Sequence, residues 1–279
     1  MAWYKHWWVF IAVLLVAAMV IAVFTLLTPQ ENVKPVAPAK VAPDNAWVAP
    51  VINNDTSLAP DTKNLLMYGQ DLIAHTAKYF GPKGVVSHTS NGMNCQNCHL
   101  DAGRKSWGNN FGAVAANYPR FNPRAGRLQS IYGRINDCFQ RSLNGRPVDT
   151  ATREMRAMFA YIRWLGRAVA PNSRPVGSGV EKIAFINRAA LPDSGRLVYA
   201  AKCAVCHGQS GGGLLSATGL EYAYPPLWGA NSYNTGAGLY RLSGFAGFVK
   251  NNMPYLQATH ATPVLTISQA CPGDPSDGW

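Results

Sequence analysis

The pentapeptide CQNCH at residues 95–99 decides the fold of this chain, and CAVCH at residues 203–207 repeats its pattern. Cys-x-x-Cys-His is the attachment motif for c-type haem: the thiols form thioethers with the porphyrin and the histidine binds the iron. A zinc site or redox disulfides are the alternatives for such cysteine pairs. Neither requires a histidine after both pairs, so the sequence predicts two covalently bound haems. Their attachment residues are Cys95, Cys98, His99, Cys203, Cys206 and His207.

Each motif follows a segment with helical periodicity and precedes a long loop rich in Gly, Pro and Asn. Residues 61–80 and 151–167 carry apolar side chains at i, i+3 and i+4, which predicts one helix before and one after the first motif. A third helix is expected to begin near residue 191 and to run into the second motif. No stretch keeps the period-two alternation of a strand. We therefore predict an all-α protein with two cytochrome c-like domains, each enclosing one haem.

The N-terminal segment predicts a membrane anchor. Residues 7–27 carry no charge, and a helix of that length crosses a hydrocarbon core of ~30 Å. A cleaved signal peptide is the alternative, although its apolar region is normally shorter. Covalent haem attachment of this kind takes place outside the bacterial cytoplasm, which predicts a location on the periplasmic face of the inner membrane. The predicted boundaries are a transmembrane anchor at 1–27, a Pro/Ala-rich tether at 28–55, domain 1 at 56–169, a linker at 170–190 and domain 2 at 191–279.

The second axial ligand of each iron is expected in the loop downstream of its motif. In the second unit that loop contains Met253, which is followed by Pro254 and is predicted to bind the iron together with His207. An ordinary core methionine is one alternative, and Lys250 as the ligand is another.

The corresponding loop of the first unit contains Cys138, within RINDCFQRSLNG at residues 134–145. We predict that Cys138 is a thiolate ligand of the first haem, because iron and nearby cationic side chains favour the thiolate. A disulfide with Cys271 or an inert buried thiol is the alternative, and His75 and His88 are further candidate ligands. The nearby cations are Arg134 and Arg141.

The charge of the chain is concentrated around the first motif. The formal net charge is +11, and residues 100–170 hold eleven arginines and one lysine against four acidic residues. Such a field attracts nucleic acid, acidic proteins or small anions. The sequence contains no helix-turn-helix, zinc-finger or RNA-binding motif, so nucleic acid is not an expected partner.

The segments NGMNCQNCHLDAGRKSWGNNFGAV, RINDCFQRSLNG and YPPLWGANSYNTGAGLYRLSGFAGFVKNNMP resemble thiosulfate dehydrogenases, which are dihaem cytochromes c. The resemblance runs from about residue 64 to residue 254 and implies an enzyme that couples two thiosulfate ions to tetrathionate, or reduces tetrathionate. Electrons would pass from the first haem to the second, and then to an electron-accepting cytochrome or another carrier. The family's axial and catalytic residues match this sequence by position at His99, Cys138, His207, Met253, Arg124, Arg134 and Ser142.

The C-terminus departs from this family. A closing helix is expected after Met253, but residues 263–279 contain prolines and glycines that oppose a stable helix. We therefore expect an altered or shortened end to the second domain. Two other functions remain compatible with the sequence: a non-catalytic dihaem electron shuttle, and a carrier of sulfur on Cys138.

Overall fold

The structure, a computed structural model, forms two compact units, 1–39 and 40–279. It describes residues 15, 16, 18, 19, 46–123, 125–184, 189 and 191–266. Most of the predicted anchor and tether, Arg124, Cys271 and the unusual C-terminal residues 267–279 therefore lie outside the described residues. Within the described part, no helix combines the length and the apolar character that a membrane span requires.

The second unit is built mainly from helices, which confirms the helical class. Its α-helices are α2 (Pro60–Ala74), α3 (Thr76–Phe80), α4 (Leu100–Gly103), α5 (Val114–Asn117), α6 (Ile131–Arg141), α7 (Arg153–Leu165), α8 (Pro192–Lys202), α9 (Ala204–His207) and α10 (Leu242–Asn252). Short 3-10 turns are η1 (Ile52–Asn54), η2 (Cys95–Asn97) and η3 (Gly238–Tyr240). Two small antiparallel pairs join β1 (Arg120–Asn122) to β2 (Arg127–Gln129) and β3 (Leu214–Leu215) to β4 (Tyr222–Tyr224). These strands, of two or three residues, are too short to show the period-two pattern.

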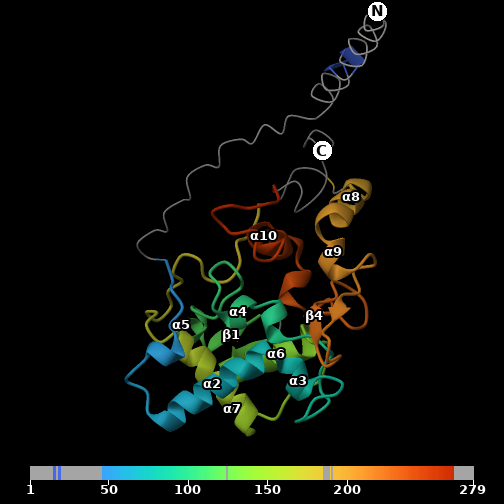
Figure 1. Ribbon diagram of the computed structural model, residues 1–279. Helices are drawn as coiled ribbons and strands as arrows, with labels where there is room; N and C mark the ends of the chain where they lie inside the picture. Colours follow the sequence, from blue (N-terminus) through green and yellow to red (C-terminus); the bar gives the residue numbers. More distant parts are fainter. Residues whose placement is uncertain are drawn as a thin grey trace, which may run out of the picture. The chain divides into compact units, whose positions relative to one another are not determined.

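The main hydrophobic core forms where α2 lies along α7 (Figure 1). The close approach needs Gly69, since a Cβ atom there would lie 2.2 Å from the carbonyl oxygen of Ala157. α7 begins after Thr152, whose hydroxyl accepts a hydrogen bond from the N–H of Met155 at 3.3 Å. The helix predicted at 151–167 is thus confirmed at 153–165, and its fully buried stripe contributes roughly 1.5–3 kcal/mol per large side chain. The buried stripe contains Met155, Met158, Tyr161 and Leu165.

The helix predicted over 61–80 is divided into α2 and α3. His75, between them, has non-helical torsion angles of φ −124° and ψ 44°. The hydroxyl of Thr76 donates to the carbonyl of Leu72 at 2.8 Å and accepts from the N–H of Cys95 at 3.0 Å. A side chain that hydrogen-bonds to the preceding turn bends a helix. The same Thr76 hydroxyl also holds the first residue of the first motif.

α6 corrects the prediction that Cys138 lies in a loop. Ser130 caps this helix, because its hydroxyl accepts from the N–H of Gly133 at 3.2 Å. The buried residues Ile131, Ile135 and Phe139 then follow one another at i+4 spacing. Cys138 therefore sits on a regular element whose apolar face packs against the first core.

Glu181 joins the segment that follows the first domain to α10. Its carboxylate accepts hydrogen bonds from the Lys250 ammonium at 3.0 Å and from the Asn251 amide at 2.9 Å. Burial raises the pKa of Glu181, but the hydrogen bonds from Asn251 and Lys250, together with the charges of Lys250 and His260, outweigh it, so the pKa lies below its ordinary value of 4.5.

Replacing Glu181 by Gln is expected to lower the free energy of unfolding by about 1–2 kcal/mol at neutral pH. A carboxyl whose pKa is depressed by folding contributes fully above its unfolded pKa, and this contribution disappears as the pH falls through the folded pKa. The difference between wild type and Glu181→Gln should therefore shrink as the pH falls below 4.5. Thermal unfolding of the haem-loaded proteins across this range measures it. A difference that grows toward acid pH would contradict the assignment.

Candidate haem-binding active site

A single cavity collects the residues that the first haem site requires. Cys95 and His99 of the first motif line it together with Cys138 of α6. Its apolar wall is formed by Ile73, Phe111, Val114, Ile131, Ile135 and Ile162. Its polar lining includes Tyr118, Arg120, Arg134, Arg174 and Ser178.

His99 is held in the form that binds a metal. Its Nδ1 lies 2.5 Å from the carbonyl oxygen of Asn109, and its ring packs on Phe111 with centroids 4.4 Å apart. Desolvation is the main reason that its pKa falls to about 4, and the charge of Arg134 lowers it further. The ring is therefore neutral at pH 7. With Nδ1–H donated to Asn109, Nε2 is left as the free ligand atom.

The two attachment thiols are also neutral in this environment. Burial raises the pKa of both Cys95 and Cys98 to about 12. The N–H of Cys95 is fixed by the Thr76 hydroxyl, so the break between α2 and α3 positions the start of the motif. Neutral thiols beside a neutral imidazole in an apolar cavity are the donor set that a covalently attached haem needs.

Cys138 reaches the same cavity from α6 and carries a free thiol. Arg134, one helical turn earlier, also lines the cavity. The charge of Cys138 is the largest reason that the pKa of Arg134 is raised, and it outweighs the opposing effect of burial. The structure therefore brings His99 of the first motif together with Arg134 and Cys138, which lie on α6 about thirty-five to forty residues further along the chain.

The other arginine of this helix is directed elsewhere. Arg141 pairs with Asp137 at 3.2 Å, and Asp137 also accepts from the Gln129 amide at 2.7 Å. The expectation that Arg141 acts on Cys138 is therefore not supported by its contacts. Ser142 follows α6, and its N–H donates to the carbonyl of Cys138 at 2.8 Å. Its side chain is not part of the cavity lining.

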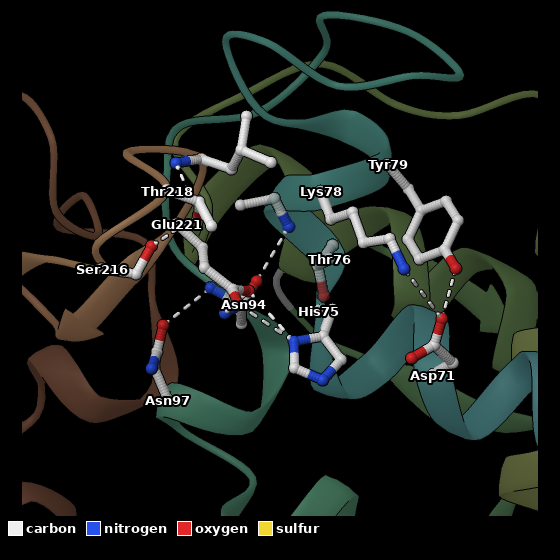
Figure 2. Close-up of polar contacts among 12 residues, drawn as sticks. Asp71, His75, Thr76, Lys78, Tyr79, Asn94, Asn97, Ser216, Thr218 and Glu221 are labelled. Atoms are coloured by element: carbon white, nitrogen blue, oxygen red, sulfur yellow. Dashed lines mark hydrogen bonds and ion pairs between the residues drawn. The ribbon is translucent and has the colours of Figure 1, made fainter.

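The alternative histidine ligands occupy other places. His75 binds Glu221, as Figure 2 shows, and His88 lies in a surface depression with Arg146. Arg124 is outside the described residues, so its role stays a prediction.

The histidine of the second motif is also held by a backbone carbonyl. Nδ1 of His207 lies 2.8 Å from the carbonyl oxygen of Pro225, which leaves Nε2 free. Met253 follows α10 directly and packs with the cluster of Leu100, Leu239 and Phe248. The pairing of Met253 with His207 as axial ligands also stays a prediction.

Several supporting residues were not predicted from the sequence. Asn109 and Pro225 fix the two histidines through backbone carbonyls, and Arg120 and Arg174 extend the positive lining of the cavity. The two carbonyl acceptors lie in the loops that follow the motifs, WGNNF and YPPLWG. This position is their only local signal in the sequence.

A polar network joins the second half of the chain to the start of the first motif (Figure 2). Glu221 accepts from the amide of Asn94 at 2.8 Å and from Nδ1 of His75 at 3.1 Å. Asn94 is only 3% exposed, and its side-chain oxygen accepts from the N–H of Ala77 at 2.8 Å. Because Asn94 directly precedes Cys95, this network positions the motif.

Replacing Glu221 by Ala is expected to lower the free energy of unfolding by about 1–3 kcal/mol, since the buried Asn94 amide loses its acceptor. Glu221→Gln keeps an acceptor oxygen and should cost less. The matched control is Asp193→Ala, which removes an exposed pair with Arg196 at 3.7 Å and should change stability by less than about 0.5 kcal/mol. Thermal unfolding of the haem-loaded proteins compares them. Equal effects of Glu221→Ala and Asp193→Ala would refute the positioning role.

A cavity lined by Cys95 and by His99, whose ring is fixed to the Asn109 carbonyl, has the arrangement that a c-type cytochrome site requires. Residues 86–170 match the family model of the SoxA/TsdA cytochrome c domain. The predicted resemblance to thiosulfate dehydrogenases is confirmed by curated relatives of that name. The thiosulfate dehydrogenase of Psychrobacter arcticus is 37% identical over 177 residues, covering 63% of this chain and 53% of the relative. That of Allochromatium vinosum is 37% identical over 179 residues, covering 62% and 65%.

The structural comparison agrees. The thiosulfate dehydrogenase TsdBA of Marichromatium purpuratum superposes with a TM-score of 0.71 at 30% identity, covering 81% of this chain and 47% of that chain. The chain therefore spans about half to two thirds of the length of the relatives it matches.

Proposed function

We propose that the chain is a dihaem c-type cytochrome that oxidises two thiosulfate ions to tetrathionate and also catalyses the reverse reaction. The observation that carries the proposal is the convergence of His99, Cys138 and Arg134 on one cavity of a SoxA/TsdA-type domain. The first haem would be held by Cys95 and Cys98. The second would be held by Cys203, Cys206 and His207, with Met253 as its second axial ligand.

The protein's own residues supply binding and nucleophilic chemistry. Arg134 offers a cation to thiosulfate, and two dianions can share one cavity only where positive charge offsets their repulsion. The Cys138 thiolate bonds to the outer sulfur of one thiosulfate, and this step releases two electrons. A second thiosulfate attacks that sulfur, which forms tetrathionate and restores the thiolate. A bound c-type haem supplies an iron that accepts electrons one at a time.

The proposal includes the path by which electrons leave the active site. Thiolate ligation lowers the potential of a haem and methionine ligation raises it, so electrons would run from the first haem to the second. An electron-accepting cytochrome or another redox carrier would then receive them. We also propose that residues 1–27 anchor the chain to the periplasmic face of the inner membrane, which cell fractionation with and without these residues tests.

The direct test is thiosulfate-dependent reduction of ferricyanide by the haem-loaded protein, with tetrathionate measured as the product. One tetrathionate per two electrons is expected. Two haems per chain, measured by pyridine haemochrome, are expected in the same preparation. Absence of turnover in both directions with both haems attached would reject the enzyme and indicate an electron-transfer cytochrome.

A further inference from the structure

The segment 174–179 forms part of the wall of the first haem cavity. Its backbone is fixed to the loop that follows the first motif: the N–H of Trp107 donates to the carbonyl of Gly177 at 2.8 Å, and the N–H of Asn109 donates to the carbonyl of Gly179 at 2.9 Å. The predicted linker at 170–190 therefore begins with residues that are built into the first haem site.

Two residues of this segment that carry hydrogen-bond donors line the cavity, the exposed Arg174 and the half-buried Ser178. The Ser178 oxygen is buried and makes no hydrogen bond to any described residue. A buried hydroxyl without a partner is costly, and native structures nearly always provide one. Because Ser178 is a lining residue of the cavity, a group that occupies the cavity is the nearest source of the missing partner.

We propose that Ser178 and Arg174 bind an anionic oxygen group in this cavity, and that the group is a propionate carboxylate of the first haem. A cation and a hydroxyl donor together match a carboxylate, since hydrogen bonds to an ionised acceptor are the stronger ones. Thiosulfate carries the same oxygen chemistry and is the other source of such a group. The inference rests on the haem site of the proposed function but does not require thiosulfate turnover.

Binding of an anion by segment 174–179 would also affect the axial histidine, His99. Asn109 accepts the hydrogen bond of His99 through its carbonyl and donates its own N–H to Gly179. An anion held by Ser178 and Arg174 therefore ties the segment to the haem edge, and the segment in turn supports the loop that orients the axial histidine. Ser178 and Arg174 are thus positioning residues for the first haem.

The test compares Ser178→Ala and Arg174→Gln with two matched controls. Ser173→Ala removes a hydroxyl of the neighbouring chain that donates to Ala170 at 2.7 Å, and Arg163→Gln removes an exposed arginine of α7. Neither control residue lines the cavity. The measurements are haem content, the reduction potential of the first haem without thiosulfate, the propionate bands in resonance Raman spectra, and the KM for thiosulfate.

Both cavity variants are expected to keep their haem, which the thioethers hold, and to show shifted propionate bands and a lower potential. Loss of a donor leaves more negative charge on the carboxylate and favours ferric iron. The controls should match wild type, and the KM should change less than about twofold. An unchanged potential with a KM raised about tenfold would assign the site to substrate and overturn the propionate assignment. No change in any measurement would overturn the anion site itself. A wild type without turnover but with shifted potentials in the variants would reject the proposed function alone.

Discussion

Cys138→Ser is expected to retain both haems and to lose at least about 10²-fold in thiosulfate turnover. The haems stay because Cys95 and Cys98 attach the first one and Cys138 takes no part in attachment. Turnover falls because a serine hydroxyl is a weaker nucleophile toward sulfur than a thiolate and a poor ligand for haem iron. The measurements are ferricyanide reduction by the purified protein and the absorption and EPR spectra of the first haem.

The control for this substitution lies on the same helix. Gln140→Ala changes an exposed side chain of α6 that does not line the cavity, so turnover and spectra should match wild type. Full turnover in Cys138→Ser with both haems present would remove the nucleophile from the mechanism. An unchanged spectrum of the first haem would show that Cys138 is not its ligand.

The fold was predictable where one local pattern determined an element. The apolar stripe and the capping Thr152 located α7 to within two residues at each end. The break at His75 was missed because it depends on the Thr76 side chain, whose partners Leu72 and Cys95 become neighbours only in three dimensions. α6 had a usable signal, the i+4 spacing of its buried residues, but the polar and charged residues between them obscured that signal.

The site was predictable in its donor types and not in its arrangement. Helical spacing places Arg134, Cys138 and Arg141 on roughly one face of α6. Only the structure shows that Asp137 holds Arg141 while Arg134 lines the cavity. Contacts such as that between Asn94 and Glu221 join residues 127 positions apart, and no local pattern encodes them.

Arg134→Met is expected to lower kcat/KM for thiosulfate by on the order of 10²-fold, or about 2.7 kcal/mol. The substrates are two dianions. Two unit charges 4 Å apart at an effective dielectric constant of about 20 repel by ~4 kcal/mol. The repulsion between two dianions at the same distance is several times larger. A cation in the cavity wall offsets this repulsion where the sulfur–sulfur bond forms. Steady-state kinetics at fixed ionic strength, with haem content measured in parallel, gives the effect.

Arg141→Met is the matched control, because it removes the same charge from the same helix but outside the cavity lining. Because Asp137 is buried, the loss of its partner should reduce stability, while kcat/KM of the folded, haem-loaded protein stays within about twofold of wild type. A long-range field would make the two substitutions equivalent, whereas local contact with substrate makes only Arg134 essential. Arg134→Lys separates the remaining alternatives: a lysine restores charge but not the planar fork of donors, so recovery would assign Arg134 a purely Coulombic role. Equal losses in Arg134→Met and Arg141→Met would mean that the cavity does not bind the substrate through Arg134.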